Sequence, residues 1–164
     1  MKKLRKDNKG FTLVELIVVL VILAILAAIL VPALLGYIDD ARNKQLQLHG
    51  KSVYTAAQTA ASKMYAKYKI PSENQADFIA EVKRLSEIST FTDSTNTTTK
   101  AYILFVKDAN DPKSEYVVSN VIYTEDGKVF VTMKSSSGKD AWNTEDNTKA
   151  PTAGTNETWI EVGK

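Results

Sequence analysis

A single carboxylate, that of Glu15, stands near the start of a long apolar run. Residues 11–31 read FTLVELIVVLVILAILAAILV, and no residue from Leu16 to Val31 is polar. An acid at the middle of a lipid-facing helix costs about 2.5–3.5 kcal/mol, and less near its end, so an acid placed there indicates a function and requires a partner. The chain has no Lys, Arg or His between Glu15 and Arg42. It therefore offers no cationic partner of its own nearby.

Cleavage of the chain after Gly10 would create the missing charge. The amino group of Phe11 would then be a cation at the depth of Glu15, available to the carboxylate of a neighbouring copy. Gly10 suits a scissile position because a residue without a side chain lets extended backbone enter a narrow protease cleft. Two charges in hydrocarbon gain more from pairing than a surface pair does. These residues predict a cleavage site and an assembly contact.

The apolar run is long enough to cross a membrane. As a helix, residues 11–31 would span about 30 Å, the hydrocarbon thickness of a bilayer. Five basic residues and one acid lie within residues 1–10, so we expect this end to stay cytoplasmic and the C-terminal side to be translocated. Without residues 1–10 the chain has 16 basic and 18 acidic residues, which gives no case for nucleic-acid binding.

Three simpler interpretations of the run are a secretory signal peptide, a signal anchor and a buried core helix. The run is too long for a signal peptide, and no Ala-x-Ala-like site follows it. A buried helix of this length would need a larger protein around it than the remaining residues supply. The signal anchor agrees with the hydropathy, and only Glu15 distinguishes it from an assembly helix.

The segment GFTLVELIVVLVILAILAAILVP resembles the N-terminus of type IV pilins and of the pseudopilins of type II secretion and competence systems. These proteins share a Gly-Phe pair, a Glu four residues after the Phe and a long apolar helix. The resemblance implies that a membrane prepilin peptidase cuts between Gly10 and Phe11 and N-methylates Phe11. It also implies that Glu15 pairs with the Phe11 amine of an adjacent subunit during assembly, with a platform protein and an ATPase as further partners.

Pro32 and Gly36 interrupt the apolar pattern at the expected membrane exit. A proline in a helix interior removes a backbone hydrogen bond and costs about 3 kcal/mol. One interpretation is a simple kink. The other, which pilins with a proline at this place resemble, is a segment around Leu30–Gly36 that melts when the helix leaves lipid for a fibre core. Ala24 stands where many family members have a second glycine, which predicts a shorter unwound segment.

The helical pattern continues to the high sixties but becomes one-sided. One apolar stripe recurs at helical spacing, formed by Leu46, Val53, Ala57, Ala60, Met64 and Tyr68. His49 lies away from this stripe, and we expect it to be solvated. Ser72 with Gln75 predicts a capping box for a second helix, whose apolar face consists of Phe78, Ile79, Val82, Leu85 and Ile88. The polar tract at 89–99 is expected to be an exposed loop.

Strands follow this tract. The ranges 101–107, 116–123, 129–134 and 157–162 are rich in β-branched and aromatic residues, and the Asp126-Gly127 pair predicts a hairpin. Residues 135–156 are polar, with Ala141-Trp142 as an apolar anchor. The sequence predicts an α+β fold, with a long N-terminal helix packed on a small antiparallel sheet. We divide it into a leader peptide (1–10), a transmembrane and assembly helix (11–36) and a globular head (37–164).

No catalytic constellation is present in the sequence. It has no cysteine and one histidine, and it lacks a glycine-rich phosphate loop and the common hydrolase motifs. We therefore expect no enzyme activity, no cofactor and no metal site. Asp140, Glu145 and Asp146 could hold calcium through flexible loop oxygens, but a solvated acidic loop is the simpler interpretation.

The leading hypothesis is a structural subunit of a type IV pilus, a homo-oligomeric filament associated with cell adhesion and twitching motility. Before assembly the chain would cross the cytoplasmic membrane once, with its head outside, and after assembly it would be extracellular. The alternative within the resemblance is a pseudopilin of a type II secretion or competence system. An alternative of another class is a membrane-anchored binding domain whose uncut helix only tethers the head.

Overall fold

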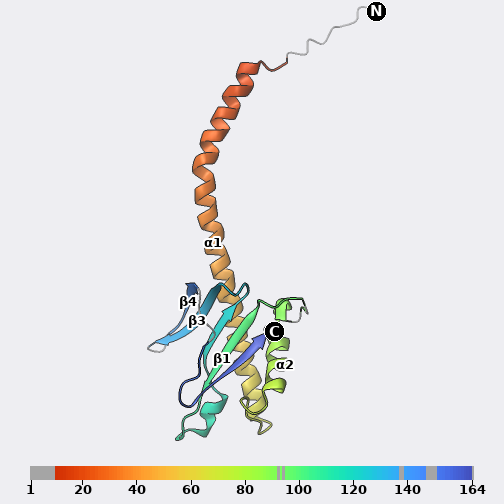
Figure 1. The fold of residues 1–164 in the computed structure, drawn as a ribbon, viewed down its shortest axis with the longest axis vertical. Helices are drawn as coiled ribbons and strands as arrows, with labels where there is room; N and C mark the ends of the chain where they lie inside the picture. The colour runs from red at the N-terminus through yellow and green to blue at the C-terminus, as the bar shows by residue number, and fades with distance from the viewer. Residues whose placement is uncertain (1–9, 92, 94, 137–138, 147–150, 164) are drawn as a thin grey trace, which may run out of the picture. The chain divides into compact units, whose positions relative to one another are not determined.

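The computed structural model describes residues 10–163 except 92, 94, 137–138 and 147–150, and gives only the backbone of 134–136, 139–141 and 143–146. Its contacts divide the chain into two compact units, residues 1–41 and 42–164. Helix α1 (Leu13–Tyr65) contributes to both units (Figure 1). The predicted single long helix is therefore confirmed, ending at Tyr65.

The first part of α1 is apolar on every side. All side chains from Gly10 to Ala41 are exposed in the structure. Leu and Ala, which are good helix formers, are frequent here, and every backbone group can be satisfied within the helix itself. The helix continues through Pro32 without a break in its assignment. No side chain in this part of the chain is buried in the structure.

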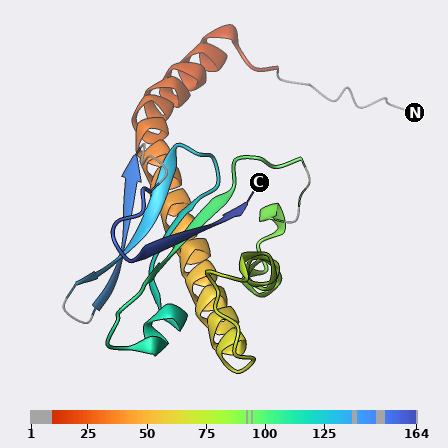
Figure 2. The same ribbon diagram turned by 60° about the horizontal axis from the view of Figure 1, so that its bottom comes forward.

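The head consists of the end of α1, a second helix α2 (Gln75–Ser86), two short 3₁₀ segments and one antiparallel sheet (Figure 2). The 3₁₀ segments are η1 (Ser89–Phe91) and η2 (Pro112–Tyr116). The strands are β1 (Lys100–Val106), β2 (Val118–Thr124), β3 (Val129–Ser136), β4 (Lys139–Asp146) and β5 (Glu157–Gly163). Their order in the sheet is β4-β3-β2-β1-β5, so β5 returns to pair with β1. The predicted α+β class is confirmed.

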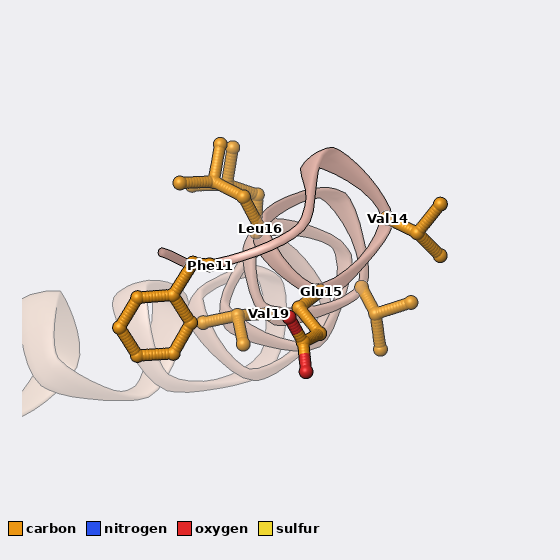
Figure 3. Close-up of a pocket in the computed structure, with 7 residues that line it drawn as sticks. Phe11, Val14, Glu15, Leu16 and Val19 are labelled. Carbon is orange, nitrogen blue, oxygen red and sulfur yellow. The ribbon is translucent and has the colours of Figure 1, made fainter. Parts of the chain in front are cut away.

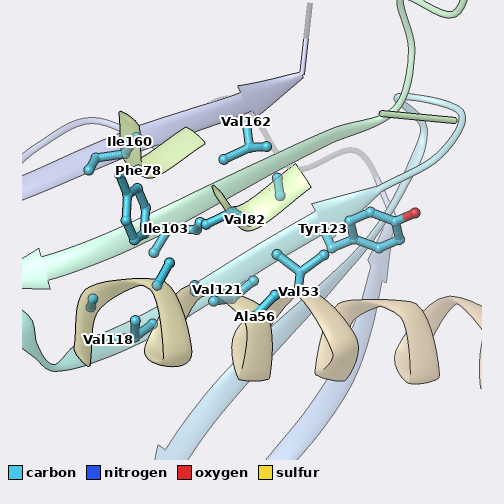
Figure 4. Close-up of a cluster of buried hydrophobic side chains, with 14 of the residues drawn as sticks. Val53, Ala56, Phe78, Val82, Ile103, Val118, Val121, Tyr123, Ile160 and Val162 are labelled. Atoms are coloured by element: carbon cyan, nitrogen blue, oxygen red, sulfur yellow. The ribbon is translucent and has the colours of Figure 1, made fainter. Parts of the chain in front are cut away.

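The core lies between one face of the sheet and the two helices (Figure 4). Val53 of α1, Phe78 and Val82 of α2, and Ile103 and Tyr123 of the sheet have no exposed surface. Alternation along each strand sends every second side chain to this face. The predicted stripe of α1 is buried from Leu46 to Met64. Its last predicted member is wrong, because Tyr68 lies beyond the helix end and is 95% exposed.

Three other predictions about the head are wrong. Residues 135–146 lie outside the predicted strands but form the end of β3 and all of β4, and the two strands pair from Val129↔Asp146 to Ser136↔Lys139. Ser72 is not a helix cap; Asn74 occupies that place, and Gln75 Nε2 donates to the Ser72 carbonyl instead. The tract after α2 is not wholly exposed, because Phe91 is buried against Tyr123.

Candidate assembly site at the start of the apolar helix

Thr12 and Glu15 form a reciprocal cap at the start of α1. The Thr12 backbone N–H and its Oγ1 both donate to Glu15 Oε2, at 2.8 and 2.7 Å, and the Glu15 N–H donates to Thr12 Oγ1 at 3.2 Å. Thr12 precedes the first helical residue and Glu15 is the third helical position, which is the geometry of a capping box. Such a cap stabilises a helix by about 0.5–2 kcal/mol. It fixes both the helix start and the carboxylate.

Sequence reasoning missed this role of Thr12. The sequence predicted a cationic partner for Glu15, whereas the structure supplies a neutral one from three residues away. The signal was present in the sequence, because a Thr followed three residues later by a Glu before an apolar run is the pattern of a capping box. The chain offers Glu15 no cationic partner nearby, but it supplies a neutral one in Thr12.

The side chains around Glu15 form an open apolar hollow. Its lining residues are Phe11, Val14, Glu15, Leu16, Val18, Val19 and Leu20. The Phe11 ring, Val19 and the Glu15 carboxylate project towards the same side of the helix (Figure 3). Phe11 is 90% exposed. Glu15 is thus the polar group of an otherwise apolar surface that a second helix could cover.

The remaining predicted residues lie on the same segment. Gly10 lies two residues before Thr12, where the capping box begins, and an added Cβ there would meet no atom within 4 Å. Pro32 and Gly36 lie inside α1 one helical turn apart, and the space around Gly36 is equally open. The structure thus places Gly10, Phe11 and Glu15 together at one helix start. Pro32 and Gly36 lie farther along the same helix.

Helix α1 is long and apolar enough to cross a membrane, by its length and composition. Residues 5–31 match the family model of the prokaryotic N-terminal methylation motif. This motif supports a type IV pilin-like or pseudopilin protein. The matched segment includes Gly10, Phe11, Thr12 and Glu15. Comparisons with curated proteins and with solved structures gave no match.

A second polar cluster lies in the head, and sequence reasoning missed it. His49 Nδ1 lies 2.5 Å from Glu125 Oε1, and the Tyr123 hydroxyl donates to the same oxygen at 3.0 Å. Burial, together with the nearby Glu125 carboxylate, raises the pKa of Tyr123. His49 was expected to be solvated, and its side chain is 36% exposed, but it also links α1 to the turn between β2 and β3. No local sequence signal joins residues so far apart.

Metal-ligating side chains are the next feature of the described residues. Within the part of the chain that it describes, no three His, Cys, Asp or Glu side chains gather closely enough to hold a metal ion. The side chains of Asp140, Glu145 and Asp146, the acidic group noted in the sequence, lie outside the described residues. Their backbone belongs to β4 and is not a flexible loop.

Proposed function

We propose that the chain is a structural subunit of a type IV pilus filament and that its role is not catalytic. In this proposal a prepilin peptidase removes residues 1–10 by cutting between Gly10 and Phe11, and Phe11 is then N-methylated. The subunit waits in the cytoplasmic membrane with its head outside. An assembly platform and an ATPase then transfer it into the extracellular fibre.

The observation that carries the proposal is the fully exposed apolar part of α1. Every side chain from Phe11 to Ala41 is exposed in the structure, and most of these side chains are apolar. An apolar surface of this extent requires either lipid or other copies of the same helix. The methylation motif on residues 5–31 supports the second possibility, because it belongs to proteins that polymerise through this helix.

Glu15 supplies the registry of this assembly. Both bonds from Thr12 end on Oε2, so Oε1 can accept the Phe11 amine of a neighbour without loss of the cap. If neighbouring helices were shifted along their axes, the carboxylate and the amine would each be unpaired in an apolar medium. Burying an unpaired charge costs free energy, so other staggers are disfavoured. The charge pair therefore selects one stagger, while helix packing supplies the attraction.

The experiment separates the charge of Glu15 from its cap. Glu15→Ala removes both, whereas Glu15→Gln keeps an acceptor for Thr12 and removes the charge. We expect both variants to be cleaved after Gly10 and methylated, as mass spectrometry of the N-terminus would show, and neither to form filaments by electron microscopy. Glu73→Gln, which removes an exposed carboxylate of the head, should assemble normally.

Normal filaments from Glu15→Gln would refute the charge pair. A native protein that keeps residues 1–10 and occurs only as monomers would favour the membrane-anchored binding domain instead. Filaments that stay confined to the cell envelope and support secretion or DNA uptake would identify a pseudopilin.

A further inference from the structure

The proposed cleavage bond between Gly10 and Phe11 lies just outside the helix. Residues 10–12 are exposed and not helical, and α1 starts at Leu13. The Thr12 carbonyl accepts the Leu16 N–H at 3.2 Å, so the backbone hydrogen bonds of the helix begin at this residue. Only one residue, Phe11, separates the bond to be cut from the start of the helical hydrogen bonding.

The hydrogen bonds of Thr12 prevent the helix from continuing towards the leader. In a longer helix the Glu15 N–H would bond to the Phe11 carbonyl, four residues back, but here it donates to Thr12 Oγ1 at 3.2 Å. The Thr12 N–H would bond to the carbonyl of residue 8, but it donates to Glu15 Oε2 at 2.8 Å. Both N–H groups that a longer helix needs at this point are therefore occupied within the cap.

The residues before Thr12 offer another place for the helix to start. Asp7 and Asn8 are residue types that cap helices, and they precede Thr12 by about one helical turn. A helix that began there would include both Gly10 and Phe11. Gly10 opposes such a helix only weakly, because one glycine in a helix interior lowers its stability about fivefold relative to alanine. The cap at Thr12 is thus what favours the later start.

The position of the helix start determines whether the bond can be cut. A helix with its side chains is about 10–12 Å wide, and its carbonyl and N–H groups are bonded to one another. A narrow protease cleft instead accepts a single extended strand whose backbone groups are free to bond to the enzyme. A Gly10–Phe11 bond inside the helix would have to unwind before each cleavage.

We propose that Thr12 is a positioning residue for processing, because its cap keeps the Gly10–Phe11 bond outside the helix and open to the peptidase. This inference rests on the proposed function, since it requires cleavage at that bond. The Glu15 side chain matters less to it. The bond to Thr12 Oγ1 comes from the backbone of residue 15 and is retained in Glu15→Ala, in agreement with the normal cleavage expected of that variant.

The test measures cleavage of the full-length chain by a prepilin peptidase in a neutral detergent, followed over time by mass spectrometry. Thr12→Val keeps the shape of threonine but cannot cap a helix. It should lower kcat/KM about two- to thirtyfold, the range that corresponds to the loss of an N-cap. Thr12→Ser and Thr12→Asn change the shape of the side chain and still cap, so they should be cut at the rate of the unaltered chain.

Nuclear magnetic resonance of the uncut chains shows whether the conformation itself has changed. The ¹³Cα chemical shifts of Gly10 and Phe11 should be non-helical in the unaltered chain and in Thr12→Asn. They should move towards helical values in Thr12→Val. Thr55→Val is the matched control, because it removes a hydroxyl that bonds the Lys51 carbonyl at 3.0 Å in the head. It should change neither the shifts nor the cleavage rate.

The outcomes separate this inference from the proposed function. If the unaltered chain and Thr12→Val were cut equally fast, Thr12 would not position the bond, although the proposed function would stand. Slow cleavage of Thr12→Asn, or slow cleavage of Thr12→Val without a change in the ¹³Cα shifts, would mean that the peptidase recognises the threonine side chain directly, and the inference would be wrong. An unaltered chain that is not cut between Gly10 and Phe11 would refute the proposed function itself.

Discussion

The carboxylate of Glu15 has two oxygens, and the bonds from Thr12 use the same one, Oε2. This arrangement lets one residue do two things. In the membrane, the cap satisfies part of the carboxylate and two groups of Thr12, which lowers the cost of an acid at that depth. In the filament proposed above, the second oxygen would remain available to a cation. A glutamate does this better than an aspartate, because its longer side chain reaches back one helical turn.

Gly50 lies where α1 packs closely against the sheet, and there is no room for a larger residue. A Cβ added there would lie 2.8 Å from Trp142 Cζ3 and 2.9 Å from Val131 Cγ2. Gly50→Ala should therefore destabilise the head by about 1 kcal/mol: overpacking costs about 1–3 kcal/mol, and the better helix propensity of alanine recovers about 1 kcal/mol. Thermal unfolding followed by tryptophan fluorescence measures this change.

Gly36→Ala is the matched control for Gly50, because an added Cβ at Gly36 meets no atom within 4 Å. It should leave the unfolding temperature of the head unchanged. An unfolding temperature of Gly50→Ala equal to or above that of the unaltered chain would show that Trp142 moves aside freely. The proposed close approach of α1 and β4 would then be wrong.

At the scale of elements, the sequence predicted the features that depend on neighbouring residues. It did not predict those that depend on residues far away in the chain. The stripe on α1 and the Asp126-Gly127 hairpin depend on nearby residues, and both are confirmed, with Gly127 at a φ of 72°. Strand β4 reads KDAWNTED and has no alternation, so only its pairing with β3 makes it a strand. Gln58 shows the same limit: its amide bonds the Tyr116 carbonyl and the Val118 N–H, 58 and 60 residues away.

The attachment of α2 to α1 should be sensitive to acid. Hydrogen bonds from Arg84 and Lys63 lower the pKa of Glu81 to about 2 from its ordinary 4.5. A carboxylate whose pKa is lowered by folding contributes stability above its ordinary pKa and loses it as the pH falls through the folded value. The stability of the head should therefore decrease from about pH 4.5 to about pH 2. In Glu81→Gln, this decrease should be smaller in denaturant titrations at successive pH values.

Lys83→Gln tests whether any charge on α2 has the same effect. Lys83 lies on the same helix and forms no ion pair with the residues described, so its removal should leave the acid-dependent decrease intact. If Glu81→Gln lost stability with acid as steeply as the unaltered chain, other carboxylates, such as Asp77, would account for the dependence.

At the scale of the whole molecule, the two units of the chain depend on different environments. All the buried apolar side chains of the described residues lie from Leu46 onward, and the apolar segment before Ala41 contributes none of them. The head thus has a core of its own. Under the proposed function, the apolar segment would obtain its packing from lipid or from other copies, and a subunit would change its surroundings during assembly without refolding its head.

A fragment consisting of residues 42–164 should therefore fold and stay monomeric in aqueous buffer. It loses no side chain that the structure shows buried, and it discards the exposed apolar surface that would drive association. Circular dichroism should show a cooperative thermal transition, and sedimentation velocity should show one species of monomer mass. The unaltered chain should need detergent to remain dispersed. A fragment that is unfolded, or that associates as strongly as the unaltered chain, would mean that the head requires the apolar segment. The proposed transfer of an intact head from membrane to filament would then be wrong.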